Sequence, residues 1–272
     1  MSLQARNNIH LSGSGPATMV FAHGFGCDQT MWRDLVPAFE DRFRIVTYDL
    51  VGMGGSDWSK YDRNRYASAH GHANDLLEII DAYASGQVVF IGHSVSAMIG
   101  LLATIKAPEK FAAQIMVSPS PSYVNDGSYV GGFNADDLEQ LLQTMDQDFL
   151  GWSLRVAPMI MRAPHRPELG RELIRSFVRN DREIARHFAR VTFLSDYRDD
   201  LPHSAVPALL LQCSDDLLVP QEVGHYLQRQ MPHAVLDVID NVGHCPHLSA
   251  ADASCRAINR FLKRVQGTTK FA

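Results

Sequence analysis

The chain has 272 residues, of which 46% are hydrophobic and 20% are charged, a balance typical of a soluble globular protein. Its net charge is −5 and no run of lysines and arginines stands out, which argues against nucleic acid or an anionic membrane as a partner. No apolar stretch is long enough to cross a bilayer, and the N-terminus lacks the apolar segment of a signal peptide, so we expect a cytoplasmic protein.

The first part of the chain alternates predicted strands with predicted helices. Short apolar runs with β-branched residues predict four strands, over residues 18–22, 44–48, 87–91 and 112–117. Helical periodicity predicts three helices between them, over residues 31–39, 66–83 and 95–105. His70 and His72 are expected on the surface of the second helix. This alternation indicates a mostly parallel sheet with helices on both faces.

The alternation stops between Pro119 and Asp196, where no strand is predicted. Four helical segments fill this stretch, over residues 134–145, 147–160, 167–179 and 182–193. We therefore expect a helical lid, residues 120–195, inserted into a core formed by residues 1–119 and 196–272. After the insertion the sequence predicts two strands and two helices, over residues 208–212, 235–239, 221–230 and 249–265.

One motif stands out at the end of the third predicted strand. Residues 91–97 read Ile-Gly-His-Ser-Val-Ser-Ala and place Ser94 between that strand and the next helix. A serine on such a sharp turn is the nucleophile of α/β-hydrolases, and small residues must flank it. The usual pattern is G-x-S-x-G, whereas this chain has Ser96 in the last position. The motif alone is weak, so the prediction depends on finding a base, an acid and an oxyanion loop.

Candidates for the acid and the base follow the last two predicted strands. Asp216 lies in the turn after the fifth strand, and His244 lies just after the last one. The order Ser94, Asp216, His244 is that of α/β-hydrolases. A serine hydroxyl needs a neutral imidazole to take its proton, and a carboxylate holds that imidazole in the required tautomer. Asp215 and His247 remain alternative candidates for these two roles.

The oxyanion formed in such a reaction needs two hydrogen-bond donors. We expect the amide of Val95, directly after the serine, and the amide of Phe25, in the loop after the first strand. The reaction requires no metal and no organic cofactor. The four cysteines form no C-x-x-C pair and predict neither a zinc site nor a disulfide framework. The glycine-rich segment 49–56 lacks the G-K-[ST] ending of a phosphate loop and is expected to form a tight turn.

Several longer runs resemble one branch of the α/β-hydrolase superfamily, the RsbQ-like proteins, which include plant karrikin and strigolactone receptors. Residues 23–29 read His-Gly-Phe-Gly-Cys-Asp-Gln, and residues 92–100 read Gly-His-Ser-Val-Ser-Ala-Met-Ile-Gly. Residues 118–121 read Ser-Pro-Ser-Pro, and residues 243–249 read Gly-His-Cys-Pro-His-Leu-Ser. The serine at position 96 is itself a feature of this branch, so the departure from G-x-S-x-G supports the resemblance.

The resemblance implies a V-shaped lid of four helices over a hydrophobic pocket. By matching positions, the pocket is lined by Phe25, Tyr123, Phe133, Leu138, Leu141, Trp152, Phe193 and Leu217. The implied activity is hydrolysis of a small hydrophobic ester or lactone. The alternative function is signalling, in which the pocket makes or senses a small molecule and the lid engages a partner. The resemblance suggests a PAS-domain regulatory protein as that partner.

Overall fold

The structure is a computed structural model that describes residues 2–266. A seven-stranded sheet forms its centre, with the strand order β1-β3-β2-β4-β5-β6-β7. The strands are β1 (His10–Ser12), β2 (Ala17–Ala22), β3 (Phe43–Tyr48), β4 (Val88–His93), β5 (Phe111–Val117), β6 (Ala208–Asp215) and β7 (Ala234–Val242). Neighbours from β3 to β7 pair in parallel, and β1 pairs with β3 in the antiparallel sense. The predicted α/β-hydrolase architecture, a mostly parallel sheet with flanking helices, is confirmed.

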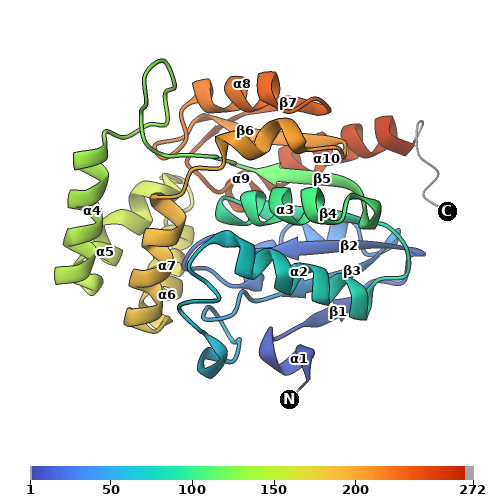
Figure 1. Ribbon diagram of the computed structural model, residues 1–272, viewed down its shortest axis with the longest axis horizontal. Coiled ribbons are helices and arrows are strands. Elements are labelled where there is room, and N and C mark those ends of the chain that lie inside the picture. The colour runs from blue at the N-terminus through green and yellow to red at the C-terminus, as the bar shows by residue number, and fades with distance from the viewer. Residues whose placement is uncertain (1, 267–272) are drawn as a thin grey trace.

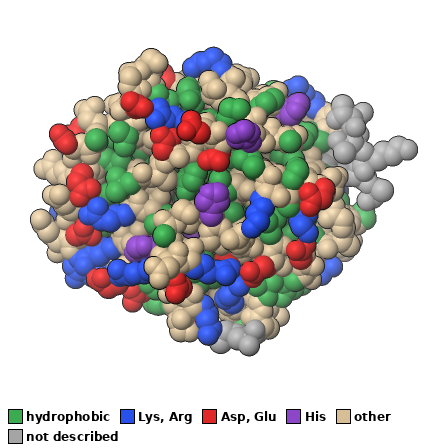
Figure 2. Space-filling view, in the orientation of Figure 1, with side chains coloured by type: hydrophobic (Ala, Val, Ile, Leu, Met, Phe, Trp, Pro, Cys, Tyr) green, Lys and Arg blue, Asp and Glu red, His purple; other side chains and the backbone are tan. Residues whose placement is uncertain are grey.

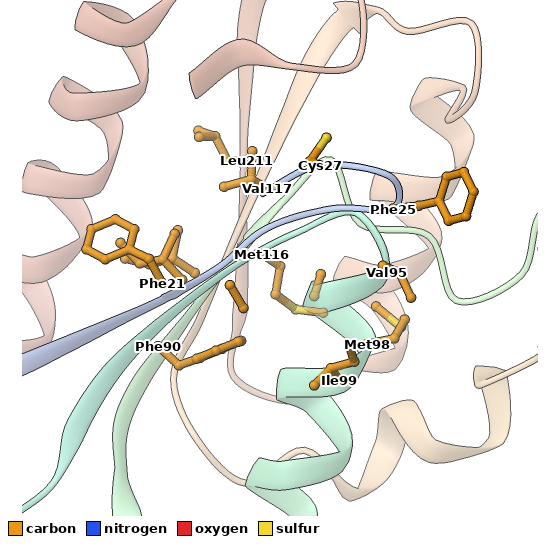
Figure 3. Close-up of a cluster of buried hydrophobic side chains, with 14 of the residues drawn as sticks. Phe21, Phe25, Cys27, Phe90, Val95, Met98, Ile99, Met116, Val117 and Leu211 are labelled. Carbon is orange, nitrogen blue, oxygen red and sulfur yellow. The ribbon is translucent and has the colours of Figure 1, made fainter. Parts of the chain in front are cut away.

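The middle of the sheet is buried on both faces. Strands β4 and β5 are buried at every position, as their continuous apolar sequences require. Helices α2 (Ala69–Tyr83) and α3 (Val95–Lys106) pack against each other in front of the sheet (Figure 1), and α8 (Gln221–Gln230) and α10 (Ala251–Gln266) contact β6 and β7. Figure 3 shows side chains of β4, β5 and α3 gathered in the interior, among them Phe90, Met116, Met98 and Ile99.

Four helices lie between β5 and β6 in the sequence and group together at one end of the sheet (Figure 1). They are α4 (Ala135–Gln147), α5 (Phe149–Met161), α6 (Pro167–Arg179) and α7 (Arg182–Phe193). Two of them begin at aspartates whose carboxylates accept backbone amides: Asp148 caps α5 and Asp181 caps α7. We call this group the helical insertion. Its helices match the four predicted segments to within about two residues at each end.

The predicted helix over residues 31–39 is wrong. The structure has two short 3-10 turns there, η1 (Gln29–Trp32) and η2 (Val36–Ala38). Pro37 disfavours an α-helix here, because it has no amide to bond to the Arg33 carbonyl and its ring crowds that carbonyl. The predicted helix over 249–265 corresponds to α10, which begins two residues later, and a separate short helix, α9 (Pro246–Ser249), precedes it.

Some short elements were not predicted, because they have little hydrophobic pattern. These are α1 (Leu3–Arg6), β1, η3 (Trp58–Lys60), η4 (Pro108–Lys110) and η5 (Arg198–His203). All three residues of β1 are exposed, so no apolar alternation marks this strand. The surface position expected for His72 is also wrong: its side chain is buried, with its ring stacked on Tyr66 and tilted against Phe188.

Acidic and basic side chains are interspersed on the face of the molecule shown in Figure 2. Among residues 2–266, no helix combines the length and the apolar composition that a membrane span requires.

Candidate active site

Ser94 occupies a strained turn between β4 and α3. Its backbone angles are φ 55° and ψ −119°, in a region that side-chain-bearing residues rarely adopt. The Ser94 amide donates to the carbonyl of Val117, at the end of β5, over 2.8 Å. A Cβ at Gly92 would lie 2.4 Å from the carbonyl oxygen of Ser96, so the turn needs glycine there. These features are those of a nucleophile elbow.

Ser96, the residue that departs from the usual motif, has a structural role of its own. Its side chain is fully buried, and its Oγ donates to the carbonyl oxygen of His23 over 2.5 Å. His23 lies in the loop after β2, which also carries Phe25. The hydroxyl therefore ties the elbow directly to the predicted oxyanion loop, a bond that glycine could not make.

Asp216 and His244 form a buried pair at the ends of β6 and β7. His244 Nδ1 lies 2.7 Å from Asp216 Oδ2, and the other carboxylate oxygen accepts the amides of Leu218 and Val219 over 2.9 and 3.3 Å. A carboxylate accepts hydrogen bonds, so Nδ1 carries a proton toward Asp216 and Nε2 is directed away from the carboxylate. A general base in this position needs this ring orientation.

The structure separates the alternative candidates from this pair. Asp215 is 53% exposed and its carboxylate contacts Arg162 on the surface. His247 is buried, and its ring packs against Trp32 with centroids 4.8 Å apart. Asp216 is thus the carboxylate that faces His244.

Ser94 Oγ contacts Tyr123 rather than the imidazole. The two hydroxyl oxygens lie 3.3 Å apart, and His244 Nε2 is buried without a hydrogen-bond partner among the described residues. Burial raises the pKa of Tyr123 above its ordinary value, so the tyrosine stays a neutral hydroxyl. Tyr123 follows β5, so these site residues extend from the carboxyl ends of neighbouring strands, where open α/β sheets place their ligands.

The two predicted oxyanion donors are available. Within residues 2–266, neither the Val95 amide nor the Phe25 amide donates a hydrogen bond to another residue. The Val95 amide is at the first position of α3, where helix amides lack intrahelical acceptors and favour negative charge. Gly26, with φ of 71°, and the bond from the Cys27 amide to the Gly24 carbonyl shape the loop that carries Phe25.

The Phe25 side chain points away from the strands (Figure 3) and packs against the helical insertion. Its ring centroid lies 5.7 to 6.5 Å from those of four insertion residues: Trp152, Phe177, Phe188 and Phe193. Tyr123 joins this group through Phe193, with ring centroids 5.1 Å apart. The structure therefore brings four of the predicted pocket residues together, namely Phe25, Tyr123, Trp152 and Phe193.

The other predicted pocket residues differ in how deeply they are buried. Leu138 is buried, and Phe133 and Leu141 are partly buried against the core. Leu217 is 45% exposed on the turn after β6, and its place in the pocket stays a prediction. The sequence-based pocket omitted Phe177 and Phe188, although the i, i+3, i+4 spacing of buried residues on α6 and α7 marks both faces as apolar.

A buried group of potential metal ligands lies beneath the elbow. The ligand atoms of His93, Cys245 and His247 lie within 4.8 Å of one another. His93 Nε2 already donates to the carbonyl of His244 over 2.9 Å, and burial raises the pKa of the Cys245 thiol well above its ordinary value. A protonated thiol is a poor ligand, so packing beneath the turn accounts for this group.

The glycine-rich segment after β3 forms a tight turn around Asp49. One carboxylate oxygen of Asp49 accepts the amide of Gly55 over 2.8 Å, and the other accepts the amide of Gln29 over 2.8 Å. The amides of Gly52 and Gly54 donate to Ser56 Oγ and Asn180 Oδ1, so these three glycine amides of the turn all have acceptors within the protein. This agrees with the predicted turn.

Comparisons with known proteins give the family. The model of the alpha/beta hydrolase family matches residues 19–257. The karrikin insensitive 2 receptor CA of Petunia hybrida is 36% identical over 251 residues, which cover 92% of this chain and 93% of the receptor. The strigolactone esterase RMS3 of Pisum sativum is 35% identical and covers 89% of this chain and 91% of its own. A hydrolase structure from Oleispira antarctica superposes with a TM-score of 0.93 at 40% identity, over 96% of each chain.

These similarities extend over nearly the whole chain and include the helical insertion. They confirm the predicted relationship to the plant receptors. The chain belongs to the alpha/beta hydrolase family.

Proposed function

We propose that this protein is a serine hydrolase that cleaves a small hydrophobic ester or lactone. Ser94 is the nucleophile, His244 is the base, Asp216 orients His244, and the amides of Phe25 and Val95 hold the oxyanion. The observation that carries the proposal is the strained Ser94 turn together with the buried Asp216–His244 pair, in which Nδ1 faces the carboxylate.

The reaction proceeds in two balanced steps. Ser94 Oγ exchanges its contact with Tyr123 for one with His244 Nε2, which takes the hydroxyl proton as Oγ attacks the ester carbonyl. The tetrahedral oxyanion collapses, the alkoxide leaves with the proton from His244, and an acyl-serine remains. His244 then takes a proton from a water molecule, which attacks the acyl carbonyl. The bond between the acyl group and Ser94 Oγ breaks, His244 returns the proton to Oγ, and the carboxylic acid leaves.

The surroundings of Ser94 favour an apolar substrate. The aromatic group around Phe25 is buried. Among the described residues, Ser94 Oγ has a side-chain hydrogen-bond contact with the Tyr123 hydroxyl. The names of relatives include a strigolactone esterase and a methyl ester esterase, both of which act on esters. We infer that residues 120–195 form a lid over this site and that the core comprises residues 1–119 and 196–272.

The experiment is hydrolysis of p-nitrophenyl acetate by the wild type and by Ser94→Ala. The variant loses the nucleophile, so turnover should fall to the uncatalysed background, while circular dichroism stays unchanged. Ser254→Ala is the matched control, since Ser254 is also buried but its hydroxyl bonds only the Ala250 carbonyl, just before α10 begins. Covalent labelling by a fluorophosphonate should add one adduct, at Ser94. Full turnover by Ser94→Ala would refute the proposal.

The relatives named as receptors favour a second candidate function, signalling through a partner protein. In that case the site makes or senses a small molecule, and the lid presents the result to a partner, which we propose to be a PAS-domain regulator. A pull-down with a purified PAS-domain protein would test this. Retention by the wild type and loss with Ser94→Ala supports signalling, and no retention in either case leaves hydrolysis as the function.

A further inference from the structure

The segment that joins α5 to α6, residues 160–166, lies against the loops that carry Asp216 and His244. We propose that this α5–α6 junction positions the acid and the base for catalysis, and that Arg162 is its positioning residue. The inference rests on the proposed function, because it assigns Asp216 and His244 the roles given above.

The first contact is between the junction and the backbone of the base. The His244 amide donates to the carbonyl oxygen of Ile160 over 2.9 Å. The last carbonyls of a helix have no partner within the helix, so this one is free to hold another segment. Gly243 also lies against the end of α5. Its φ is 99°, and a Cβ there would lie 2.1 Å from the Met161 carbonyl oxygen. The last turn of α5 therefore fixes where the His244 backbone lies.

The second contact links the junction to the acid loop. Arg162 ends α5 in the left-handed conformation, with φ 37° and ψ 45°, and its Nη1 donates to Asp215 Oδ1 over 2.8 Å. The Asp215 carbonyl in turn accepts the Gly243 amide over 2.8 Å. Arg162, Asp215 and Gly243 thus form one continuous chain of bonds from the insertion through the acid loop to the base loop.

A third contact lies on the far side of the base. Arg166 Nη1 donates to the carbonyl of Leu248 over 2.8 Å, in the short helix α9 that follows His244. The junction therefore holds the loop that carries His244 at two places: at residues 243–244, and at Leu248 in α9. A displacement of the junction must move this loop or break these bonds.

Simple anchoring of the insertion is the competing explanation, and the two differ in what they predict for Arg162. Its guanidinium is 38% exposed and the Asp215 carboxylate is 53% exposed, so the pair contributes little to stability. Catalytic rates depend much more steeply on position, since a displacement of about 1 Å can cost about a hundredfold. A positioning role therefore predicts a loss of kcat without a matching loss of thermal stability.

The test compares Arg162→Ala with a matched control in the same insertion. Arg190 is also 38% exposed, but its partners Glu139 and Asp146 lie on α4, away from the catalytic loops. For p-nitrophenyl acetate, we expect Arg162→Ala to lower kcat by about tenfold with KM unchanged. Arg162→Lys should retain most of the activity, because a single donor to Asp215 Oδ1 suffices. Arg190→Ala should keep the wild-type kcat.

A double variant separates the bond from the individual side chains. If Arg162 acts through Asp215, the loss in Arg162→Ala with Asp215→Ala should not exceed the larger single loss. A wild-type kcat in Arg162→Ala, or an equal loss in Arg190→Ala, would overturn the inference. Failure of the proposed function is distinguishable, because it would show as undiminished turnover by Ser94→Ala.

Discussion

The strand ends and the helical insertion face each other across the candidate site, but they are held by different forces. At the strand ends the backbone itself is constrained: Ser94 has a positive φ, and Gly92 and Gly243 have no space for a Cβ. The insertion depends instead on buried apolar side chains and on exposed arginine–carboxylate pairs, such as Arg190 with Glu139. The site therefore combines a part that tolerates almost no change with a part that tolerates substitution.

The largest expected effect is at the contact between the two regions. Gly243→Ala would place a methyl group against the Met161 carbonyl in a backbone conformation that favours glycine. We expect kcat/KM for p-nitrophenyl acetate to fall by about a hundredfold or more, because the His244 loop must shift. Thermal unfolding should also occur at a lower temperature.

Gly170→Ala is the control for this substitution, within the insertion. A Cβ at Gly170, on α6, would lie 3.8 Å from its nearest neighbour, an ordinary contact. Alanine is a better helix former than glycine, so this variant should gain up to about 1 kcal/mol of stability and keep its activity. Equal losses in the two variants would mean that the two regions do not differ as described.

Acidification should act mainly through the buried histidines around the strand ends. Burial lowers the pKa of His72 and of His247 to about 3, and lowers the pKa of His93 well below its ordinary value. Between pH 6.5 and 3 the unfolded chain binds protons at His72 and His247 that the folded chain does not. Stability is therefore complete above pH 6.5 and falls on acidification, by up to about 1.4 kcal/mol per pH unit for each of these two residues. The lowered pKa of His93 acts in the same direction.

Urea denaturation at pH 7.5, 6.0 and 5.0 would measure this loss. Burial raises the pKa of Asp75, so this group works in the opposite direction and offsets part of the loss. His247→Gln should reduce the pH dependence, because it removes one of the buried histidines that cause it. A free energy of unfolding that stays constant from pH 7.5 to 5.0 would contradict the assignment of these histidines as neutral.

The smallest expected effect compares two buried serines. Ser96→Ala removes the bond that ties the elbow to the oxyanion loop, whereas Ser153→Ala removes a bond to the Phe149 carbonyl within α5. Each loses about 1 kcal/mol of stability, the usual contribution of one hydrogen bond. Only Ser96→Ala should also lower kcat, by several-fold, since the Phe25 amide is then less firmly placed. Stopped-flow measurement of acylation would show whether the loss lies in that step.

Local sequence patterns were sufficient where a feature depends on neighbours in the chain. The Ser94 turn, the order of Asp216 and His244, and the four insertion helices could all be predicted from short motifs or periodicity. The helix predicted over 31–39 is replaced by two 3-10 turns because periodicity alone does not register the effect of Pro37 on the backbone.

Features that depend on distant segments could not be predicted. The burial of His72 results from its packing against Phe188, more than a hundred residues away. The role of Ser96 becomes clear only when the His23 carbonyl is seen beside it. The contact between Ser94 and Tyr123 likewise joins two strand ends, and nothing in either local sequence indicates it.

The close approach of Gly243 to the end of α5 has a consequence for modular engineering. Exchanging the insertion for that of another hydrolase is usually planned as a replacement between two cut points in the chain. Here the Ile160 carbonyl, which accepts the His244 amide, would be removed with the insertion. The end of the new helix would then have to fit against Gly243, which leaves room for the backbone of α5. A functional chimaera must therefore carry the turns at 215–216 and 243–248 together with the helical insertion, as three separate stretches of sequence that form one transferable unit.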